Sequence, residues 1–312
     1  MPEKSNYILP FPQVVRIEPA ASCNFKCIHC PTGLDMSPTG IMTMETFERI
    51  ARNLEAVIAK QGKPLRVIVL YHGGEPLLNK HFLEMIRRSK KLAKLVKTVT
   101  NGSRLSDEVI EEIIDSGLDY IEISLDGISA EENDRIRLNP AGATFESVSG
   151  QVISLIKRRK EKNSQTPAVS ISNTQIPETE EQVSEAPHPP QHMLDRFNEV
   201  SADITYNPNW ALVWPGMPIK AENRPDNNFC DHVENTISIR SNGDMVVCCY
   251  DLVSKMPMGN VLETSIEDIW NSKRYQDVRK AIDEFNPPEL CKGCPVLYKF
   301  KPMVKSDIFP RK

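Results

Sequence analysis

Strand-like and helical segments alternate along the chain up to about residue 206, and this alternation limits the folds available to it. Short apolar runs predict strands at 14–17, 65–71, 96–100, 120–125, 168–173 and 204–206. Apolar residues at helical spacing predict helices over about 43–62, 80–95, 107–116 and 145–156. Strands that alternate with helices form parallel sheets through right-handed crossovers. We therefore expect an α/β fold, with a partial (β/α)6 TIM-like barrel over residues 14–206.

Three segments around this pattern are irregular. Residues 1–13 are expected to form an N-terminal tail. The stretch from about 161 to 196 is polar and rich in proline, which indicates an exposed loop within the last barrel units. Residues 207–229 are expected to form a linker. Its Trp210 and Trp214 either pack at a domain junction or line a substrate cleft.

From residue 230 the pattern changes to a hairpin followed by a helix. Strand-like segments at 236–240 and 245–250 are joined by Asn242-Gly243, a strong hairpin signal. Ser265 can begin a helix that runs through Ile282. We expect residues 230–312 to form a small second domain.

Charge and hydropathy exclude several classes of function. The 312 residues carry a formal net charge of −4, so no basic field indicates nucleic-acid binding. No run of eighteen apolar residues predicts a membrane span, and no signal-peptide pattern begins the chain. We expect a cytoplasmic protein, in whose reducing environment clustered cysteines indicate metal binding or catalysis ahead of disulfides.

The eight cysteines fall into two groups, three between 23 and 30 and five between 230 and 294. The first group has the spacing Cys23-x3-Cys27-x2-Cys30. Three thiolates can hold three irons of a 4Fe–4S cluster and leave the fourth iron open to an outside ligand. The alternative is a structural zinc site with His29 as the fourth ligand, although His29 lies between two of the cysteines and would reach the same ion only with strain.

A second motif follows the strand predicted at 65–71, at the end where barrel active sites form. It consists of His72, Gly73, Gly74, Glu75 and Pro76. The glycines let the backbone approach a ligand closely, and a carboxylate there can accept hydrogen bonds from an ammonium group.

The cysteine triplet and this motif together resemble the radical S-adenosylmethionine (SAM) superfamily. The resemblance implies that the open iron binds SAM and that reductive cleavage of SAM releases a 5′-deoxyadenosyl radical. Glu75 would then hold the SAM amino group, and Arg137 the SAM carboxylate. Ser124 would contact the carboxylate or ribose and His72 the ribose, with Asn173 as a further candidate. From the residues alone, Ser124 could instead be a strand-end cap, Arg137 a surface residue and Asn173 a turn former.

The second cysteine group resembles the SPASM and twitch family of C-terminal extensions. That resemblance implies an auxiliary 4Fe–4S cluster bound by Cys230, Cys248, Cys291 and Cys294. No cysteine follows Cys294, so one auxiliary cluster is expected. A zinc ribbon of similar spacing is the alternative.

Cys249 remains as an additional thiol. On a regular strand Cys248 and Cys249 point to opposite faces, so both cannot face one cluster. Cys249 either packs as a small apolar residue or donates a hydrogen atom to a substrate radical, a role found in radical SAM epimerases.

The resemblance leaves the substrate open. Only 22 residues precede Cys23, too few for a peptide-recognition domain, which favours a small hydroxylated substrate such as a sugar or aminocyclitol. The expected outcome is dehydrogenation or epimerisation, with a flavodoxin- or ferredoxin-type electron donor. The alternatives are a peptide or protein maturase and a non-catalytic iron–sulfur or zinc protein.

Overall fold

A computed structural model describes residues 7–215, 224–299 and 301–305. In these ranges a single sheet contains nine strands in the order β6-β5-β4-β3-β2-β1-β7-β8-β9. The strands are β1 (Val14–Ile17), β2 (Leu65–Val69), β3 (Ala93–Thr100), β4 (Tyr120–Ser124), β5 (Ala168–Gln175), β6 (Ile204–Trp210), β7 (Thr236–Ile239), β8 (Asp244–Val246) and β9 (Pro257–Asn260). Strands β1 to β6 pair with their sequence neighbours in parallel, which confirms the α/β partial barrel.

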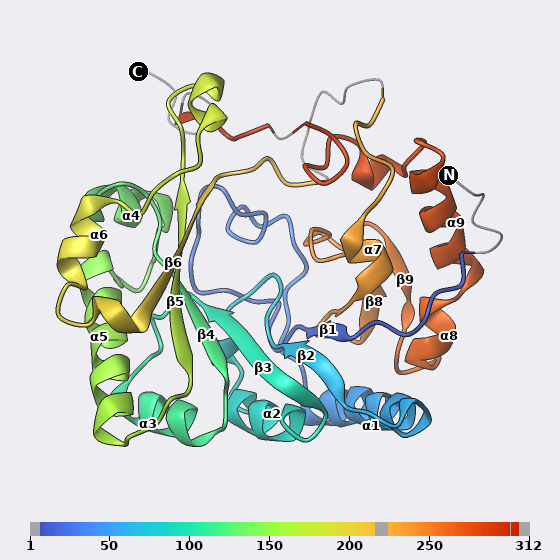
Figure 1. The fold of residues 1–312 in the computed structure, drawn as a ribbon, viewed down its shortest axis with the longest axis horizontal. Coiled ribbons are helices and arrows are strands. Elements are labelled where there is room, and N and C mark those ends of the chain that lie inside the picture. Colours follow the sequence, from blue (N-terminus) through green and yellow to red (C-terminus); the bar gives the residue numbers. More distant parts are fainter. Residues whose placement is uncertain (1–6, 216–223, 300, 306–312) are drawn as a thin grey trace.

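Helices cover the convex face of this curved sheet. Figure 1 shows α1, α2, α3 and α5 along its outer side, whereas the long loop after β1 lies within the opposite, concave side. The α-helices are α1 (Met44–Gln61), α2 (Phe82–Ser89), α3 (Asp107–Asp115), α4 (Ala130–Ile136), α5 (Phe145–Glu161), α6 (Gln191–Arg196), α7 (Asp231–Asn235), α8 (Ile266–Trp270) and α9 (Lys273–Asp283). Short 3-10 helices are η1 (Pro76–Leu78), η2 (Glu180–Ser184), η3 (Ser201–Asp203) and η4 (Glu289–Cys291). No helix in the described ranges is long and apolar enough to cross a membrane.

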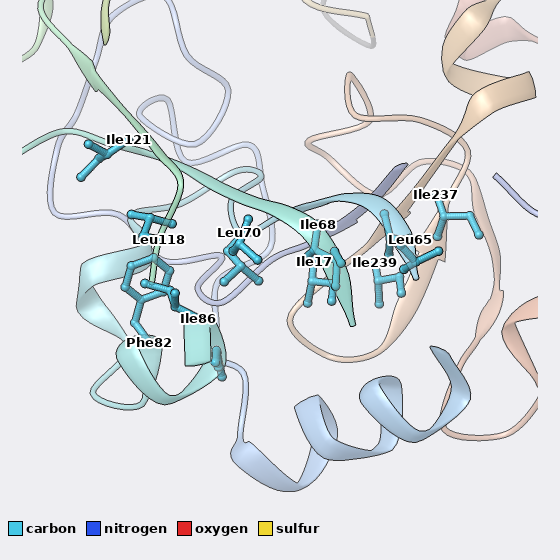
Figure 2. Close-up of a cluster of buried hydrophobic side chains, with 14 of the residues drawn as sticks. Ile17, Leu65, Ile68, Leu70, Phe82, Ile86, Leu118, Ile121, Ile237 and Ile239 are labelled. Carbon is cyan, nitrogen blue, oxygen red and sulfur yellow. The ribbon is translucent and has the colours of Figure 1, made fainter. Parts of the chain in front are cut away.

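The core lies between the sheet and the helices and extends from the barrel into the C-terminal part. Ile17 on β1, Ile68 on β2 and Ile239 on β7 are completely or almost completely buried and lie side by side in Figure 2. Each such side chain stabilises the fold by about 1.5–3 kcal/mol. This shared core binds the hairpin to the barrel.

Strand β7 joins the two parts through the sheet as well, because it pairs in parallel with β1. Arg16 stands opposite Ser238, and Ile17 opposite Ile239. Strands β7, β8 and β9 then continue as an antiparallel meander, and the hairpin expected at Asn242-Gly243 is confirmed, with Gly243 at φ +88°. The auxiliary cysteines are therefore placed by strands that extend the barrel sheet.

Several sequence-based boundaries are wrong. The helix expected over 80–95 ends at Ser89, and its last residues belong to β3. The helix expected from Ser265 to Ile282 is two helices, because the Ser272 hydroxyl accepts a hydrogen bond from Tyr275 N and starts a second one. The strand expected over 245–250 ends at Val246, where the pairing with β9 is irregular.

Other elements were longer than expected or were not predicted. Strands β5 and β6 continue to Gln175 and Trp210, beyond the apolar runs that predicted them, because each pairs with the other along this length. The stretch 161–196 contains η2 and α6, so it is not a loop throughout. Helix α4 and strand β9 are short and have few apolar residues, which explains why periodicity did not indicate them.

Candidate functional site

The first cysteine group lies in the loop after β1, which is held in place by the last residue of α4 and the segment that follows it. Lys26 N donates to Leu138 O at 2.7 Å and Ile28 N to Ile136 O at 3.0 Å. Cys27 is buried between these bonds. Gly33 passes so close to it that a Cβ on Gly33 would lie 2.2 Å from Cys27 O. The backbone of the loop around Cys27 therefore has a defined conformation.

The chemistry of this thiol set fits an iron–sulfur cluster. Burial, helped by the neighbouring Asp126, Cys30 and Cys23 and opposed by Arg137, raises the pKa of Cys27 to about 12. Buried thiolates need a compensating positive charge, which a metal supplies. Within residues 7–215, 224–299 and 301–305 no three His, Cys, Asp or Glu side chains converge tightly enough to hold a single metal ion, so the fit rests on the thiols themselves.

His29, the alternative zinc ligand, is directed elsewhere. Its Nε2 lies 3.2 Å from Asp126 Oδ2, and its backbone carbonyl accepts a hydrogen bond from Trp214 Nε1 at 2.9 Å. Trp214 thereby attaches the linker to the cysteine loop. The ring of Trp214 also packs edge-on against Tyr250, with centroids 5.7 Å apart.

The Gly-Gly-Glu-Pro loop contacts the residues that precede the cysteine triplet. Glu75 N donates to Ser22 O at 3.0 Å. At Gly74 a Cβ would lie 2.3 Å from Ser22 O and 2.4 Å from Ala20 O, so only glycine fits. The two glycines were expected to let a ligand approach the backbone. At Gly74 the close approach is instead made by the backbone of residues 20–22 of the same chain.

The carboxylate of Glu75 is buried and fixed by the end of β3. It accepts hydrogen bonds from Thr100 Oγ1 and Asn101 N, both at 2.7 Å, and from Leu77 N at 3.0 Å. Asn101 Nδ2 in turn donates to Asn24 Oδ1 at 2.8 Å, within the cysteine loop. Three segments that are distant in sequence therefore meet at one edge of the barrel.

Arg137 is buried beside the cysteine loop, where it pairs with Asp126. Its Nη1 lies 2.7 Å from Asp126 Oδ2. Burial alone would raise the pKa of Asp126, but the Arg137 charge and the His29 hydrogen bond hold it well below its usual value. Arg137 is thus no surface residue, and its expected pairing with the SAM carboxylate stays a prediction.

Asn173 and Ser124 lie on adjacent strands of the same region. Asn173 is inside β5 and not at its end, and its Nδ2 donates to Leu125 O at 2.8 Å and Gly127 O at 3.0 Å. These bonds hold the turn that carries Asp126. Ser124 ends β4 and is partly exposed. Their contacts with a ligand stay predictions.

His72 connects this region to the C-terminal part. Its ring is buried, with Nε2 3.0 Å from Cys249 O and Nδ1 3.1 Å from Arg240 Nη1. Because arginine only donates, Nδ1 accepts and Nε2 carries the proton that is donated to Cys249 O. Burial lowers the pKa of His72, which favours this neutral form. A ring held in this way is a positioning group between the Gly-Gly-Glu-Pro loop and Cys249, and its expected contact with ribose stays a prediction.

The second cysteine group gathers beside β7 and β8. Cys230 precedes α7, Cys248 follows β8, and Cys291 and Cys294 lie at and after η4. All four are buried. Burial raises the pKa of Cys294 to about 11, with a further contribution from Cys230, and it raises the pKa of Cys248 well above its usual value. This set also fits a cluster by its donor chemistry.

Cys249 has a different environment from Cys248. Its Sγ lies 3.6 Å from His232 Nδ1, and the side chain is partly exposed. Burial would raise the pKa of Cys249, but the His232 hydrogen bond and the charge of Arg16 outweigh this effect and lower it. Both neighbours were absent from the sequence prediction.

Sequence reasoning also missed Glu18, which organises the centre of this region. Its carboxylate accepts from Gly73 N at 2.9 Å and Ser241 N at 3.0 Å, and it pairs with Arg240 Nε at 3.0 Å. A carboxylate directly after an apolar strand, and an arginine at the end of another, were the available signals. Their pairing depends on the contact between β1 and β7.

Comparisons with known proteins agree with this geometry. The radical SAM superfamily model matches residues 17–186, and the SPASM iron–sulfur cluster-binding domain model matches residues 230–295. A tungsten-containing aldehyde ferredoxin oxidoreductase cofactor-modifying protein from Pyrococcus furiosus is 26% identical, over 89% of this chain and 86% of that protein.

Two solved structures share the fold over nearly the whole chain. BtrN in complex with AdoMet and 2-DOIA superposes with a TM-score of 0.56 at 18% identity, covering 91% of this chain and 93% of BtrN. The anSMEcpe structure with bound AdoMet and the Cp18Cys peptide has a TM-score of 0.61 at 16% identity, covering 93% and 92%. At these identities the likeness shows the fold alone.

Proposed function

This chain belongs to the radical SAM superfamily and carries a SPASM iron–sulfur domain, and we propose that it acts on a carbinol C–H bond of a small hydroxylated molecule. The protein is a radical SAM enzyme that uses SAM and two 4Fe–4S clusters. Held by the first cluster, SAM would supply a 5′-deoxyadenosyl radical able to abstract a hydrogen atom from the substrate. Dehydrogenation or epimerisation of a sugar- or aminocyclitol-like compound is the proposed outcome.

We assign the ligands from the two thiol sets. Cys23, Cys27 and Cys30 would hold the cluster that binds SAM, and their enclosed loop next to Glu75 supports this. The four buried thiols beside β7 and β8 would hold the auxiliary cluster; they are Cys230, Cys248, Cys291 and Cys294. A flavodoxin- or ferredoxin-type donor in the cytoplasm is the proposed source of electrons.

The position of Cys249 is the observation that supports epimerisation or dehydrogenation as the reaction. Its partly exposed thiol lies beside His232 and Arg16, and its backbone is bound to His72 next to the Gly-Gly-Glu-Pro loop. A thiol there can give its hydrogen atom to a substrate carbon radical, so that a C–H bond forms, the S–H bond breaks and a thiyl radical remains. One electron from the external donor and one proton restore the thiol.

Replacing Cys249 by alanine tests this role. If the enzyme is an epimerase, the variant should lose at least a hundredfold in epimerised product while it still forms 5′-deoxyadenosine, because only hydrogen return is removed. Deuterium tracing is the measurement. Label moving from substrate into 5′-deoxyadenosine identifies the C–H bond, and solvent deuterium in the product indicates hydrogen return.

The same tracing separates dehydrogenation from epimerisation. A dehydrogenase should keep working in the Cys249→Ala variant and incorporate no solvent deuterium at the reacting carbon. Full epimerisation by this variant would contradict the donor role of the thiol. Absence of 5′-deoxyadenosine from the reduced wild-type protein with SAM would contradict catalysis altogether.

The runner-up is action on a peptide or protein. Among the solved relatives, BtrN is bound to 2-DOIA and anSMEcpe to a peptide, so the shared fold does not decide the substrate. The name of the P. furiosus relative describes the modification of a cofactor, which favours a small molecule. Label transfer from a candidate precursor peptide into 5′-deoxyadenosine would favour the peptide alternative instead.

Glu75 makes SAM binding dependent on pH. Burial raises the pKa of this carboxyl above 4.5, although hydrogen bonds from Asn101 and Thr100 oppose the shift. Only the carboxylate pairs with the SAM ammonium group, so the dissociation constant of SAM should rise as the pH falls towards that raised pKa. The Glu75→Gln variant should bind SAM about 10–100-fold more weakly, because a hydrogen bond to a charged group is lost.

Equilibrium dialysis of SAM between pH 8 and pH 5.5 checks this expectation. In Glu75→Gln the pH dependence should disappear. Unfolding does not explain the effect, since a carboxyl with a raised pKa favours the folded state at low pH and loses that contribution as the pH rises. Equal pH dependence in both proteins would contradict the assignment of Glu75.

A further inference from the structure

Arg16 is a cation on the concave face of the barrel, and in the described part of the chain it has no carboxylate partner. It lies in β1, opposite Val69 on β2 and Ser238 on β7. Its neighbours Val15 and Ile17 are buried in the core on the helix side, so the alternation of the strand places Arg16 on the other face. Among the residues that the structure describes, no ion pair involves Arg16.

The guanidinium is held by the side chain of Tyr71. Its central carbon lies 4.5 Å from the centroid of the Tyr71 ring. Arg16 also forms a side-chain hydrogen bond with Tyr71, which uses one of the five guanidinium N–H donors and leaves others for a ligand. Arg16 Nε is buried and has no hydrogen-bond partner in the described part of the chain.

Two further buried groups beside Arg16 are also unsatisfied. Neither Ser238 Oγ nor Arg240 Nη2 has a hydrogen-bond partner among the described residues. Ser238 is the register partner of Arg16, and Arg240 follows two residues later, so it extends from the same face of that strand. Buried donors that lack partners destabilise a protein. A ligand that forms hydrogen bonds with Arg16 Nε, Ser238 Oγ and Arg240 Nη2 would explain why all three are present.

The carboxylate nearest to these groups is already neutralised. Glu18 pairs with Arg240 Nε at 3.0 Å and accepts from Gly73 N at 2.9 Å. Glu18 is therefore not available to neutralise the positive charge of Arg16. It interacts electrostatically with the thiols of Cys249 and Cys248, whereas Arg137 does so with Cys27 and Cys23. The sheet register places Arg16 opposite Ser238 on β7, and β7 leads through β8 to Cys248 and Cys249.

We propose that Arg16, Ser238 and Arg240 Nη2 bind an oxyanion of the substrate, either a carboxylate or a phosphate group. Arginine pairs with both in a bidentate manner, and the serine hydroxyl and the free Nη2 supply further donors. This inference rests on the proposed function, to which it adds an acidic group on the hydroxylated small molecule. It also places that group beside Cys249, the proposed hydrogen donor.

Anion titration of the anaerobic holoenzyme tests the site without turnover. Sodium phosphate and sodium acetate are titrated separately by calorimetry at constant ionic strength, so the two arms distinguish phosphate from carboxylate. The wild-type protein should bind at least one of them, and Arg16→Gln should weaken that binding at least tenfold. Ser238→Ala should weaken it by about threefold. The exposed Arg66 on the neighbouring strand provides the control, because Arg66→Gln should leave the affinity unchanged.

Arg16→Lys guards against a folding defect, since it keeps the charge but not the bidentate geometry. It should retain both clusters and bind the preferred anion with an affinity between those of wild type and Arg16→Gln. A wild-type protein that binds neither anion more tightly than Arg16→Gln overturns the proposal. Failure of the proposed function would look different, because anion binding would persist while no small hydroxylated compound transferred label to 5′-deoxyadenosine.

Discussion

Replacing Cys27 by alanine is expected to abolish the formation of 5′-deoxyadenosine and to lower the iron content from about eight to about four atoms per chain. Cys27 is the most enclosed thiol of its loop, which is bound to the end of α4 through Ile28 and to the segment after α4 through Lys26. No nearby side chain in the described ranges is free to replace it, since His29 faces Asp126. Iron and sulfide analysis of anaerobically reconstituted protein, with chromatography of the products of SAM, measures both effects.

The matched control is Cys249→Ala, which removes a thiol that we assign to no cluster. It should keep about eight irons and continue to cleave SAM. A Cys27→Ala protein with full iron content and SAM cleavage would contradict the assignment of the first cluster. Loss of four irons from Cys249→Ala would instead make Cys249, and not Cys248, a ligand of the auxiliary cluster.

Replacing Gly74 by alanine is expected to destabilise the protein by about 3 kcal/mol and to weaken SAM binding at least tenfold. The added Cβ would lie 2.3 Å from Ser22 O and 2.4 Å from Ala20 O, and both of these atoms belong to the backbone. Relief of the overlap requires the Gly-Gly-Glu-Pro loop to move away from the cysteine loop. Glu75 would then leave the position in which Thr100 and Asn101 hold it.

Gly150→Ala is the control for this substitution. Gly150 lies inside α5, where a Cβ would meet nothing closer than Arg196 Nη2 at 3.6 Å. Alanine in a helix interior should stabilise the protein by about 0.5–1 kcal/mol and leave SAM binding unchanged. Urea unfolding and equilibrium binding of SAM compare the two variants. Wild-type stability in Gly74→Ala would mean that the two loops are not packed as closely as the structure shows.

Local sequence signals predicted the alternating strands and helices of the barrel. They failed where tertiary contacts determine where an element begins or ends. Strands β1 to β5 were predictable because each buries apolar residues in a short run, whereas β6 buries Ile204 alone. The break at Ser272 is also encoded locally, by a serine that can cap a second helix, but the continuous apolar spacing from Ile269 to Ile282 concealed it. Strand β8 ends at Val246, so strand alternation does not determine how Cys248 and Cys249 are directed.

The sequence alone determined the class of chemistry, because cysteine spacing and the Gly-Gly-Glu-Pro motif are short-range patterns that need no fold to be recognised. Only the tertiary structure decided how the charged side chains pair. Glu18 meets Arg240, 222 positions later in the chain, because β1 and β7 lie side by side in one sheet. That register is a long-range property of the packed sheet, and the same register leaves Arg16 opposite Ser238 without a carboxylate partner among the described residues.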